Sequence, residues 1–382
     1  AEYKKAGSCK VLIVTGCMAQ RYKNEIIEEV PEVDAVLGTT SYGDILKAIN
    51  EAMEGKHFEE FKDIDYLPEK LGKRVLTTGG HFGYLKIAEG CDKHCTYCII
   101  PKLRGKFRSV PMERLIEQAK EMAEEGVKEL ILVAQETTVY GTDIYGKKSL
   151  HVLLKELCKI KGIRWIRVLY CYPEEIYDEL IQTMKEEKKI CHYLDLPIQH
   201  ASDRILKRMG RRTTQAELVE IVNKLRQEIP DIVLRTTLIS GFPGETQEDH
   251  EELMGFVDEM EFDRLGVFTY SAEEDTPAAT MPDQVPEEVK EERRDEIMEL
   301  QQEISYDKGT DRIGQELLVM IEGKVADESA YIGRTYGDAP KVDGYIFVQT
   351  GELLMTGDFA KVRVTGALEY DLIGELADEY TE

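Results

Sequence analysis

Three cysteines stand close together in residues 90–98, which read Gly-Cys-Asp-Lys-His-Cys-Thr-Tyr-Cys. Cys91, Cys95 and Cys98 have the spacing C-x3-C-x2-C. Thiolates bind soft metals and iron–sulfur clusters. Three thiolates on one short loop can hold three irons of a cubane cluster and leave the fourth iron open to a chelating ligand. The spacing therefore favours a [4Fe–4S] cluster with one open iron.

Two other interpretations of this loop stay open at this point. A structural zinc site needs four closed ligands, usually two Cys or His pairs, and no second pair lies nearby in the sequence. His94 is adjacent to Cys95, so the two side chains would converge on one metal only with difficulty. The thiols could also be reduced core cysteines, but Lys93, His94 and the glycines around them make this loop a poor core.

The other five cysteines are scattered along the chain. Cys9, Cys158, Cys171 and Cys191 lie in or beside apolar segments, which favours core packing. Cys17 follows the first apolar segment, where it is either a cluster ligand or a buried thiol at a strand end. Eight cysteines in 382 residues without a signal peptide do not make a disulfide scaffold and indicate the reducing cytoplasm.

The cysteine loop lies within a stretch of alternating strands and helices. It directly follows the first of these strands, so this stretch must position it. Six β-α units in sequence predict an α/β fold with a parallel sheet, curved into a full or partial (β/α)6 barrel whose active site lies at the carboxyl ends of the strands. The predicted strands are residues 84–88, 129–134, 165–170, 192–197, 232–239 and 264–270.

Different patterns flank this region. Residues 8–14 and 35–38 predict strands, and residues 20–29 and 42–53 predict helices, a block too short to bury a core alone. A charged helix of about residues 287–308 precedes five short strands, which predict a small antiparallel barrel. We therefore divide the chain into four parts: 1–55 as the end of an α/β domain, 56–80 as a linker, 81–308 as the barrel, and 309–382 as the small barrel.

The charge of the chain restricts its partners. The sequence has 49 basic and 74 acidic residues, a net charge of −25, which argues against a surface that binds nucleic acid throughout. Residues 313–382 contain fourteen acids and five bases, a charge near −9. No run of eighteen apolar residues occurs, so no membrane-spanning helix is expected.

The cysteine loop, with Tyr97 before its last cysteine, resembles the radical S-adenosylmethionine (SAM) superfamily. Residues 14–22, 237–246 and 313–382 are similar to three parts of its methylthiotransferase branch, the last being the TRAM barrel. Residues 134–141 and 196–203 resemble the members that modify a ribosomal protein. The relatives that modify tRNA usually have Gln-Ser-Gly-Ser where residues 199–202 here are Gln-His-Ala-Ser.

The resemblance implies a reaction and its cofactors. Cys91, Cys95 and Cys98 would hold a [4Fe–4S] cluster that chelates SAM, and an electron donor would start radical formation. The product would be a methylthio group on the β-carbon of an aspartate in small-subunit ribosomal protein twelve. A second [4Fe–4S] cluster, which carries the sulfur, would have Cys17 as its last ligand. Its other two ligands would lie upstream of Ala1, so we expect a chain that lacks the start of its first domain.

Further SAM contacts are expected at the strand ends, although each residue could instead be a polar group satisfied at the barrel rim or part of a turn. These candidates are Tyr97, Gln135, Glu136, Gln199, Arg235 and Gly241. His200, at the same strand end as Gln199, is expected to contact substrate or to hydrogen-bond locally. No residue is assigned a direct role in the chemical step.

Two basic runs keep other substrates open. They comprise Lys102, Arg104, Lys106 and Arg108, and Lys207, Arg208, Arg211 and Arg212. The ordinary explanation is a solvated face, and the alternatives are contact with an acidic substrate segment or with RNA. A tRNA adenosine methylthiotransferase is therefore the alternative enzyme, and it predicts tRNA retention that falls steeply with salt. A metalloprotein that binds a partner without chemistry is the alternative from another class.

Overall fold

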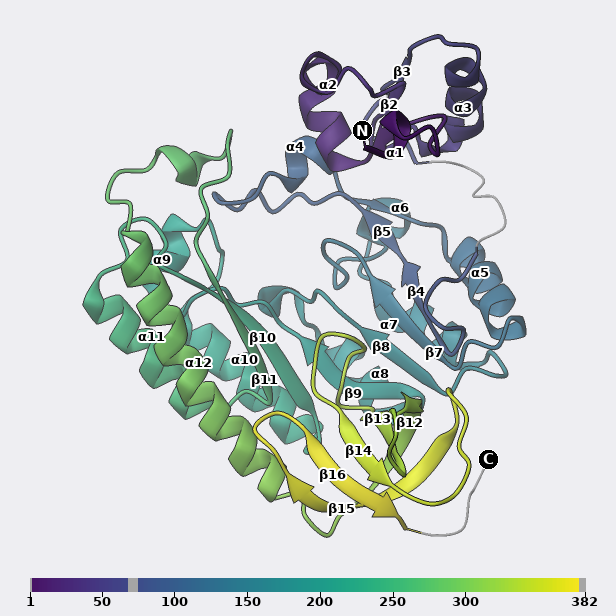
Figure 1. Ribbon diagram of the computed structural model, residues 1–382. Coiled ribbons are helices and arrows are strands. Elements are labelled where there is room, and N and C mark those ends of the chain that lie inside the picture. Colours follow the sequence, from purple (N-terminus) through teal and green to yellow (C-terminus); the bar gives the residue numbers. More distant parts are fainter. Residues whose placement is uncertain (1, 68–74, 378–382) are drawn as a thin grey trace. The chain divides into compact units, whose positions relative to one another are not determined.

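The computed structural model describes residues 2–67 and 75–377 of the chain (Figure 1). The chain forms two compact units. The first comprises residues 1–75, 89–94 and 98–108, and the second comprises residues 76–88, 95–97 and 109–382. The cysteine loop is divided by this partition, because Cys91 and Cys98 belong to the first unit and Cys95 to the second. The four-part division of the chain stays a prediction.

The first unit is built on a parallel sheet in the order β1-β2-β3. Its elements are α1 (Glu2–Lys5), β1 (Ile13–Thr15), α2 (Cys17–Glu29), β2 (Ala35–Leu37), η1 (Tyr42–Asp44), α3 (Ile45–Met53), β3 (Phe58–Glu60) and α4 (Ile100–Arg104). The predicted strand at 8–14 is wrong in extent, since β1 begins only at Ile13. The predicted linker at 56–80 contains β3, a Phe-Glu-Glu segment that pairs with β2 and has no apolar alternation to reveal it. Residues 68–74 of that range lie outside the described residues.

The second unit contains the predicted parallel sheet, in the order β11-β10-β9-β8-β7-β4 within the described chain. Its strands are β4 (Phe82–Lys86), β7 (Glu129–Val133), β8 (Trp165–Val168), β9 (Ile190–Asp195), β10 (Val233–Ser240) and β11 (Arg264–Thr269). Every pairing is parallel. The prediction of a partial (β/α)6 barrel is therefore confirmed.

Helices connect these strands. They are α5 (Met112–Glu124), α6 (Thr142–Tyr145), α7 (Leu150–Cys158), η2 (Pro173–Glu175), α8 (Asp178–Glu186), α9 (Asp203–Arg208), α10 (Gln215–Glu228), α11 (Gln247–Met260) and η3 (Pro277–Thr280). Two short strands, β5 (Ala88–Glu89) and β6 (Arg108–Ser109), form a separate pair. The predicted charged helix is α12 (Glu287–Thr310), which packs along β11 (Figure 1). Among the described residues, none of these helices has the length and apolar character needed to cross a bilayer.

The predicted small barrel is also confirmed. Its strands are β12 (Glu316–Lys324), β13 (Ala330–Thr335), β14 (Ile346–Gln349), β15 (Phe359–Ala367) and β16 (Leu372–Leu376), closed in the order β12-β13-β14-β16-β15. All pairings are antiparallel except β14 with β16, which is parallel.

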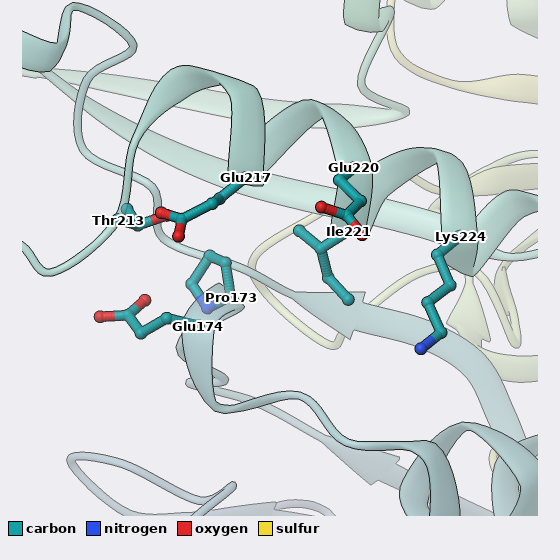
Figure 2. A pocket seen from close by; sticks show the side chains of 7 residues that line it. All are labelled: Pro173, Glu174, Thr213, Glu217, Glu220, Ile221 and Lys224. Atoms are coloured by element: carbon teal, nitrogen blue, oxygen red, sulfur yellow. The ribbon is translucent and has the colours of Figure 1, made fainter.

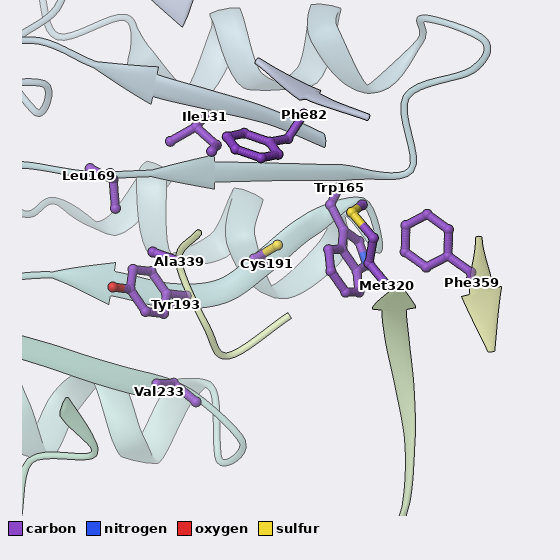
Figure 3. Close-up of a cluster of buried hydrophobic side chains, with 10 residues drawn as sticks. All are labelled: Phe82, Ile131, Trp165, Leu169, Cys191, Tyr193, Val233, Met320, Ala339 and Phe359. Carbon is purple, nitrogen blue, oxygen red and sulfur yellow. The ribbon is translucent and has the colours of Figure 1, made fainter. Parts of the chain in front are cut away.

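Apolar side chains join the small barrel to the parallel sheet. Met320 and Phe359 of the small barrel pack with buried side chains of the sheet strands (Figure 3). The ring of Trp165, the one tryptophan in the sequence, meets the edge of Phe359 at a centroid distance of 4.8 Å. The inner face of the sheet is therefore filled at this end by residues that come more than 80 positions later in the chain.

A buried group of charges lies beside this apolar contact. Glu129 of β7 accepts hydrogen bonds from Arg167 of β8 at 2.8 Å and from Arg334 of β13 at 2.7 Å. All three side chains are wholly buried. Burial raises the pKa of the Glu129 carboxyl, but Arg334 and Arg167 outweigh it and hold that pKa below its usual value. The Glu129 carboxylate is therefore charged, and it pairs with Arg167 of the sheet and with Arg334 of the small barrel.

We predict that Glu129→Gln lowers the free energy of unfolding by about 3–5 kcal/mol, because two buried guanidiniums lose their counter-charge. Guanidinium chloride unfolding, followed by Trp165 fluorescence, measures the change. Glu316→Gln is the matched control, since its pair with Arg363 is exposed and its loss should stay within about 1 kcal/mol. Equal stability of the two variants would contradict the prediction.

Candidate functional site

Residues 95–97 of the cysteine loop are fixed to the second unit by the backbone of Thr96. Its amide donates to the carbonyl of Met209 at 2.9 Å, and its carbonyl accepts from the amide of Ala278 at 2.9 Å. The ring of Tyr97 meets Phe242 edge-on at a centroid distance of 6.4 Å. This part of the loop is thus held by the segments that follow β9, β10 and β11.

Cys95 lies beside two residues that the sequence did not single out for this role. The Cys95 Sγ is buried and lies 3.8 Å from the hydroxyl of Tyr172, in the segment that follows β8. The guanidinium of Arg211 stacks over the Tyr172 ring at 4.2 Å from its centroid. The aromatic pair in residues 170–173, Tyr-Cys-Tyr-Pro, was the available signal, because it follows a strand at its carboxyl end.

Arg211 is buried, which corrects the prediction of a solvated face for this member of the second basic run. Its side chain is 1% exposed, and one nitrogen, Nη2, donates to the carbonyl of Pro197 at 3.2 Å. Its Nε and Nη1 have no hydrogen-bond partner among the residues that the structure describes. Burial lowers the pKa of the Arg211 guanidinium. Glu174 and the nearby Tyr97, Tyr172 and Cys95 outweigh burial and raise that pKa above its usual value. A permanently charged group with two unused donors fits a carboxylate.

The two candidates that follow β7 differ in exposure. Gln135 is half-buried, whereas Glu136 is buried. The Glu136 Oε1 accepts hydrogen bonds from the amide of Thr138, at 2.9 Å, and from its hydroxyl. Glu136 therefore shapes its own turn, and a role of either residue in binding SAM stays a prediction.

Gln199 has a left-handed backbone, with φ of 73°, and forms an isolated bridge to Leu238 of β10. This conformation is strained for a residue other than glycine, and such residues occur often at functional sites. Its neighbour His200 is wholly buried, so the expected contact with substrate is not supported, and the local alternative holds. The His200 Nδ1 accepts from the amide of Ser202 at 3.0 Å, and its Nε2 lies 3.5 Å from Glu245.

Glu245 organises the turn after β10. Its Oε2 accepts from the amides of Gly241 at 2.8 Å and Phe242 at 3.1 Å, and its Oε1 accepts from Arg293 at 2.9 Å. Burial raises the Glu245 pKa, but His200 and Arg293 outweigh it and hold that pKa below its usual value. Residues 199–202 and 241–245, distant in sequence, are thus joined through Glu245.

Gly241 and Arg235 have structural partners that the sequence did not indicate. Gly241 has a φ of 70°, and a Cβ there would meet the Lys290 side chain of α12 at 2.1 Å. Arg235 of β10 donates to Asp195 at 2.7 Å and lies 3.4 Å from Asp343 of the small barrel. Their contacts with SAM remain predictions.

In the first unit, Cys91 is buried, Cys98 is half-buried, and Cys17 is the half-buried first residue of α2. The Cys91 amide donates to the carbonyl of Gly105 at 3.2 Å. Within the part of the chain that the structure describes, no three His, Cys, Asp or Glu side chains are grouped so that they could hold a metal ion. The cluster ligands therefore stay a prediction from spacing.

The prediction of core packing is confirmed for Cys171 and Cys191, which are buried. Burial raises the pKa of the Cys171 thiol and raises that of Cys191 to about 12. Cys158 is half-buried, and burial likewise raises its pKa to about 12. Thiols with raised pKa values are poor metal ligands, because the ligand is the thiolate.

A pocket of about 250 Å³ lies on the outer side of the second unit, between η2 and α10 (Figure 2). It is lined by Pro173, Glu174, Thr213, Glu217, Glu220, Ile221 and Lys224. Its carboxylates come from η2 and α10, and Glu174 also lies 3.5 Å from Arg211.

Comparison with known proteins gives the relatives of this chain. The radical SAM superfamily matches residues 85–257, and the TRAM domain matches residues 313–377. A protein of Lachnoclostridium phytofermentans, named ribosomal protein uS12 methylthiotransferase RimO, is 65% identical over 98% of this chain and 85% of its own length. One of Clostridium perfringens with the same name is 53% identical over 99% and 85%. Among solved structures, coproporphyrinogen III oxidase (HemN) of Escherichia coli aligns with a TM-score of 0.46 and 16% identity over 74% of this chain and 66% of that chain.

We predict that the joint change of Cys91, Cys95 and Cys98 to Ala removes about four irons per chain after anaerobic reconstitution with iron and sulfide. Iron and sulfide analysis after gel filtration measures the loss. Cys158→Ala is the matched control and should retain the iron of the parent protein. Undiminished iron in the triple variant would show that other residues hold the cluster.

Proposed function

We propose that this chain, which belongs to the RimO family of radical SAM methylthiotransferases, adds a methylthio group to the β-carbon of an aspartate in ribosomal protein uS12. The observation that carries the proposal is the 65% identity, over 98% of the chain, to a relative named for that reaction. Residues 199–202 support it, since they differ from the pattern usual in the tRNA-modifying relatives.

The radical SAM superfamily implies a [4Fe–4S] cluster and SAM. When bound, they supply a 5′-deoxyadenosyl radical by one-electron cleavage of the sulfonium, which removes hydrogen from an unactivated carbon. Cys91, Cys95 and Cys98 would hold the cluster. Arg211 fits the carboxylate of SAM, because it is buried beside Cys95 and has two unused donors.

The remaining candidates would bind and orient SAM around this point. Tyr97 is adjacent to Thr96, Gln199 follows β9 and bridges to β10, and Gln135 and Glu136 are suited to the methionine amine. Gly241 gives the turn after β10 its left-handed backbone. Buried side chains around Cys95 exclude water from the reacting atoms, which limits quenching of a radical.

A second [4Fe–4S] cluster with Cys17 among its ligands is part of the proposal, as is a one-electron donor. The substrate implies that the reaction takes place in the cytoplasm. The acidic TRAM barrel suits a basic ribosomal protein better than tRNA. The exposed acids of the barrel include Glu316, Asp327, Glu328, Glu352, Glu369 and Glu375.

The decisive experiment offers both substrates at once. The protein is reconstituted anaerobically with iron and sulfide and incubated with SAM, reductant, purified uS12 and unmodified tRNA. We expect mass spectra to show a methylthio gain on an aspartate of uS12 alone. A gain on tRNA adenosine would overturn the proposed substrate, and no 5′-deoxyadenosine would overturn the radical reaction itself.

We further predict that Arg211→Ala raises the Kd of SAM about 10- to 100-fold, the loss expected for hydrogen bonds to a charged group. Arg212→Ala, at the exposed adjacent position, is the control and should leave the Kd unchanged. Calorimetric titration with SAM measures both, and Arg211→Lys tests whether charge without the planar fork suffices. Wild-type affinity in Arg211→Ala would remove Arg211 from the SAM site.

A further inference from the structure

One segment of the TRAM barrel, Arg334–Asp343, contacts the inner face of the parallel sheet on every strand from β7 to β11. The sheet residues that bond to it are Glu129, Arg167, Tyr193, Arg235 and Arg264, one on each strand. Their partners are Arg334, the carbonyl of Tyr336, Asp338 and Asp343. The TRAM barrel therefore supplies charged groups to the interior of the sheet.

Asp343 contacts two of these strands, through Tyr193 of β9 and Arg235 of β10. Its side chain is 2% exposed. Its Oδ2 accepts from the hydroxyl of Tyr193 and from the amide of Ala339, both at 2.8 Å. These two bonds orient the carboxylate, so that Oδ1 faces Arg235 Nε at 3.4 Å.

Arg235 also binds Asp195, the last residue of β9, and so connects Asp343 to it. Its Nη1 donates to Asp195 Oδ1 at 2.7 Å. The other oxygen of Asp195 accepts from the amide of Tyr170 at 3.1 Å, and the Asp195 carbonyl accepts from the amide of Cys171 at 2.9 Å. Two successive amides after β8 are thereby fixed by one buried residue.

Residues 170–172, which Asp195 holds in this way, have a strained backbone and contact the cysteine loop. Tyr170 has a φ of 58°, a left-handed backbone that is strained for a residue other than glycine. Such a conformation persists only when its surroundings hold it. Two residues later, the Tyr172 hydroxyl lies 3.8 Å from Cys95 Sγ, and its ring supports Arg211.

We propose that Asp343 of the TRAM barrel is a positioning residue of the radical SAM reaction. Through Arg235 and Asp195 it fixes residues 170–172 beside Cys95, so the TRAM barrel forms part of the frame of the active site. The inference rests on the proposed radical SAM activity and goes beyond it, since a barrel that only docks the substrate would not affect SAM cleavage.

Asp343→Asn tests the inference, because it keeps the size of the side chain and removes its charge. Asp358→Asn is the matched control, a buried TRAM carboxylate that accepts from the amide of Met355 within its own barrel. We expect Asp343→Asn to raise the ratio of 5′-deoxyadenosine to methylthio product about 10- to 100-fold, as a misplaced reacting group does. It should also alter the electron paramagnetic resonance signal of the reduced cluster with SAM bound.

A second pair of variants separates positioning from folding. In an Arg235→Gln background the link from Asp343 to Asp195 is already broken, so adding Asp343→Asn should change the product ratio no further. A wild-type ratio of 5′-deoxyadenosine to product and an unchanged resonance signal in Asp343→Asn would overturn the inference. It would also be overturned if Asp358→Asn raised that ratio as much as Asp343→Asn does. If the wild-type enzyme makes neither 5′-deoxyadenosine nor product, the proposed function is overturned instead.

Discussion

The carboxylate of Glu129 lies wholly buried between two arginines of different domains, and much of the second unit depends on that arrangement. A charge removed from water is tolerated only when it is paired and hydrogen-bonded. Arg167 of the sheet and Arg334 of the TRAM barrel satisfy Glu129 together. Neither the sheet nor the barrel can leave this contact without exposing an unpaired buried charge. The two domains consequently have one specified arrangement here.

This constraint extends to the distribution of charge in the TRAM barrel. Three of its fourteen acids, Glu322, Asp338 and Asp343, are paired with His81, Arg264 and Arg235, which lie outside the barrel. Their charge is used to join the domains, and only the exposed remainder is available to a basic partner. The net charge of −9 therefore overstates the field that a ribosomal protein would meet.

The reactive end is organised by the same kind of pairing, on a smaller scale. The Glu245 carboxylate accepts hydrogen bonds from two backbone amides and from Arg293, and it lies 3.5 Å from His200. It therefore joins the segments that follow β9 and β10. His200 is buried, accepts a hydrogen bond within its own turn and lies 3.5 Å from Glu245, so its observed contacts are structural.

The sequence alone determined the order of strands and helices and the spacing of the cysteines. Apolar alternation and turn residues are properties of short stretches of sequence, so the six sheet strands were recognised close to their true bounds and the five strands of the small barrel were expected. The strand Phe58–Glu60 was missed because its pairing, rather than its own pattern, makes it a strand. Only the tertiary structure decided which charges lie inside. Arg211 belongs to a basic run that looks solvated, yet it is buried against Tyr172, since burial depends on what packs from distant parts of the chain. Likewise, no spacing along the chain could place Asp343 beside Arg235, because a salt bridge between residues more than a hundred positions apart exists only once both domains have folded and met.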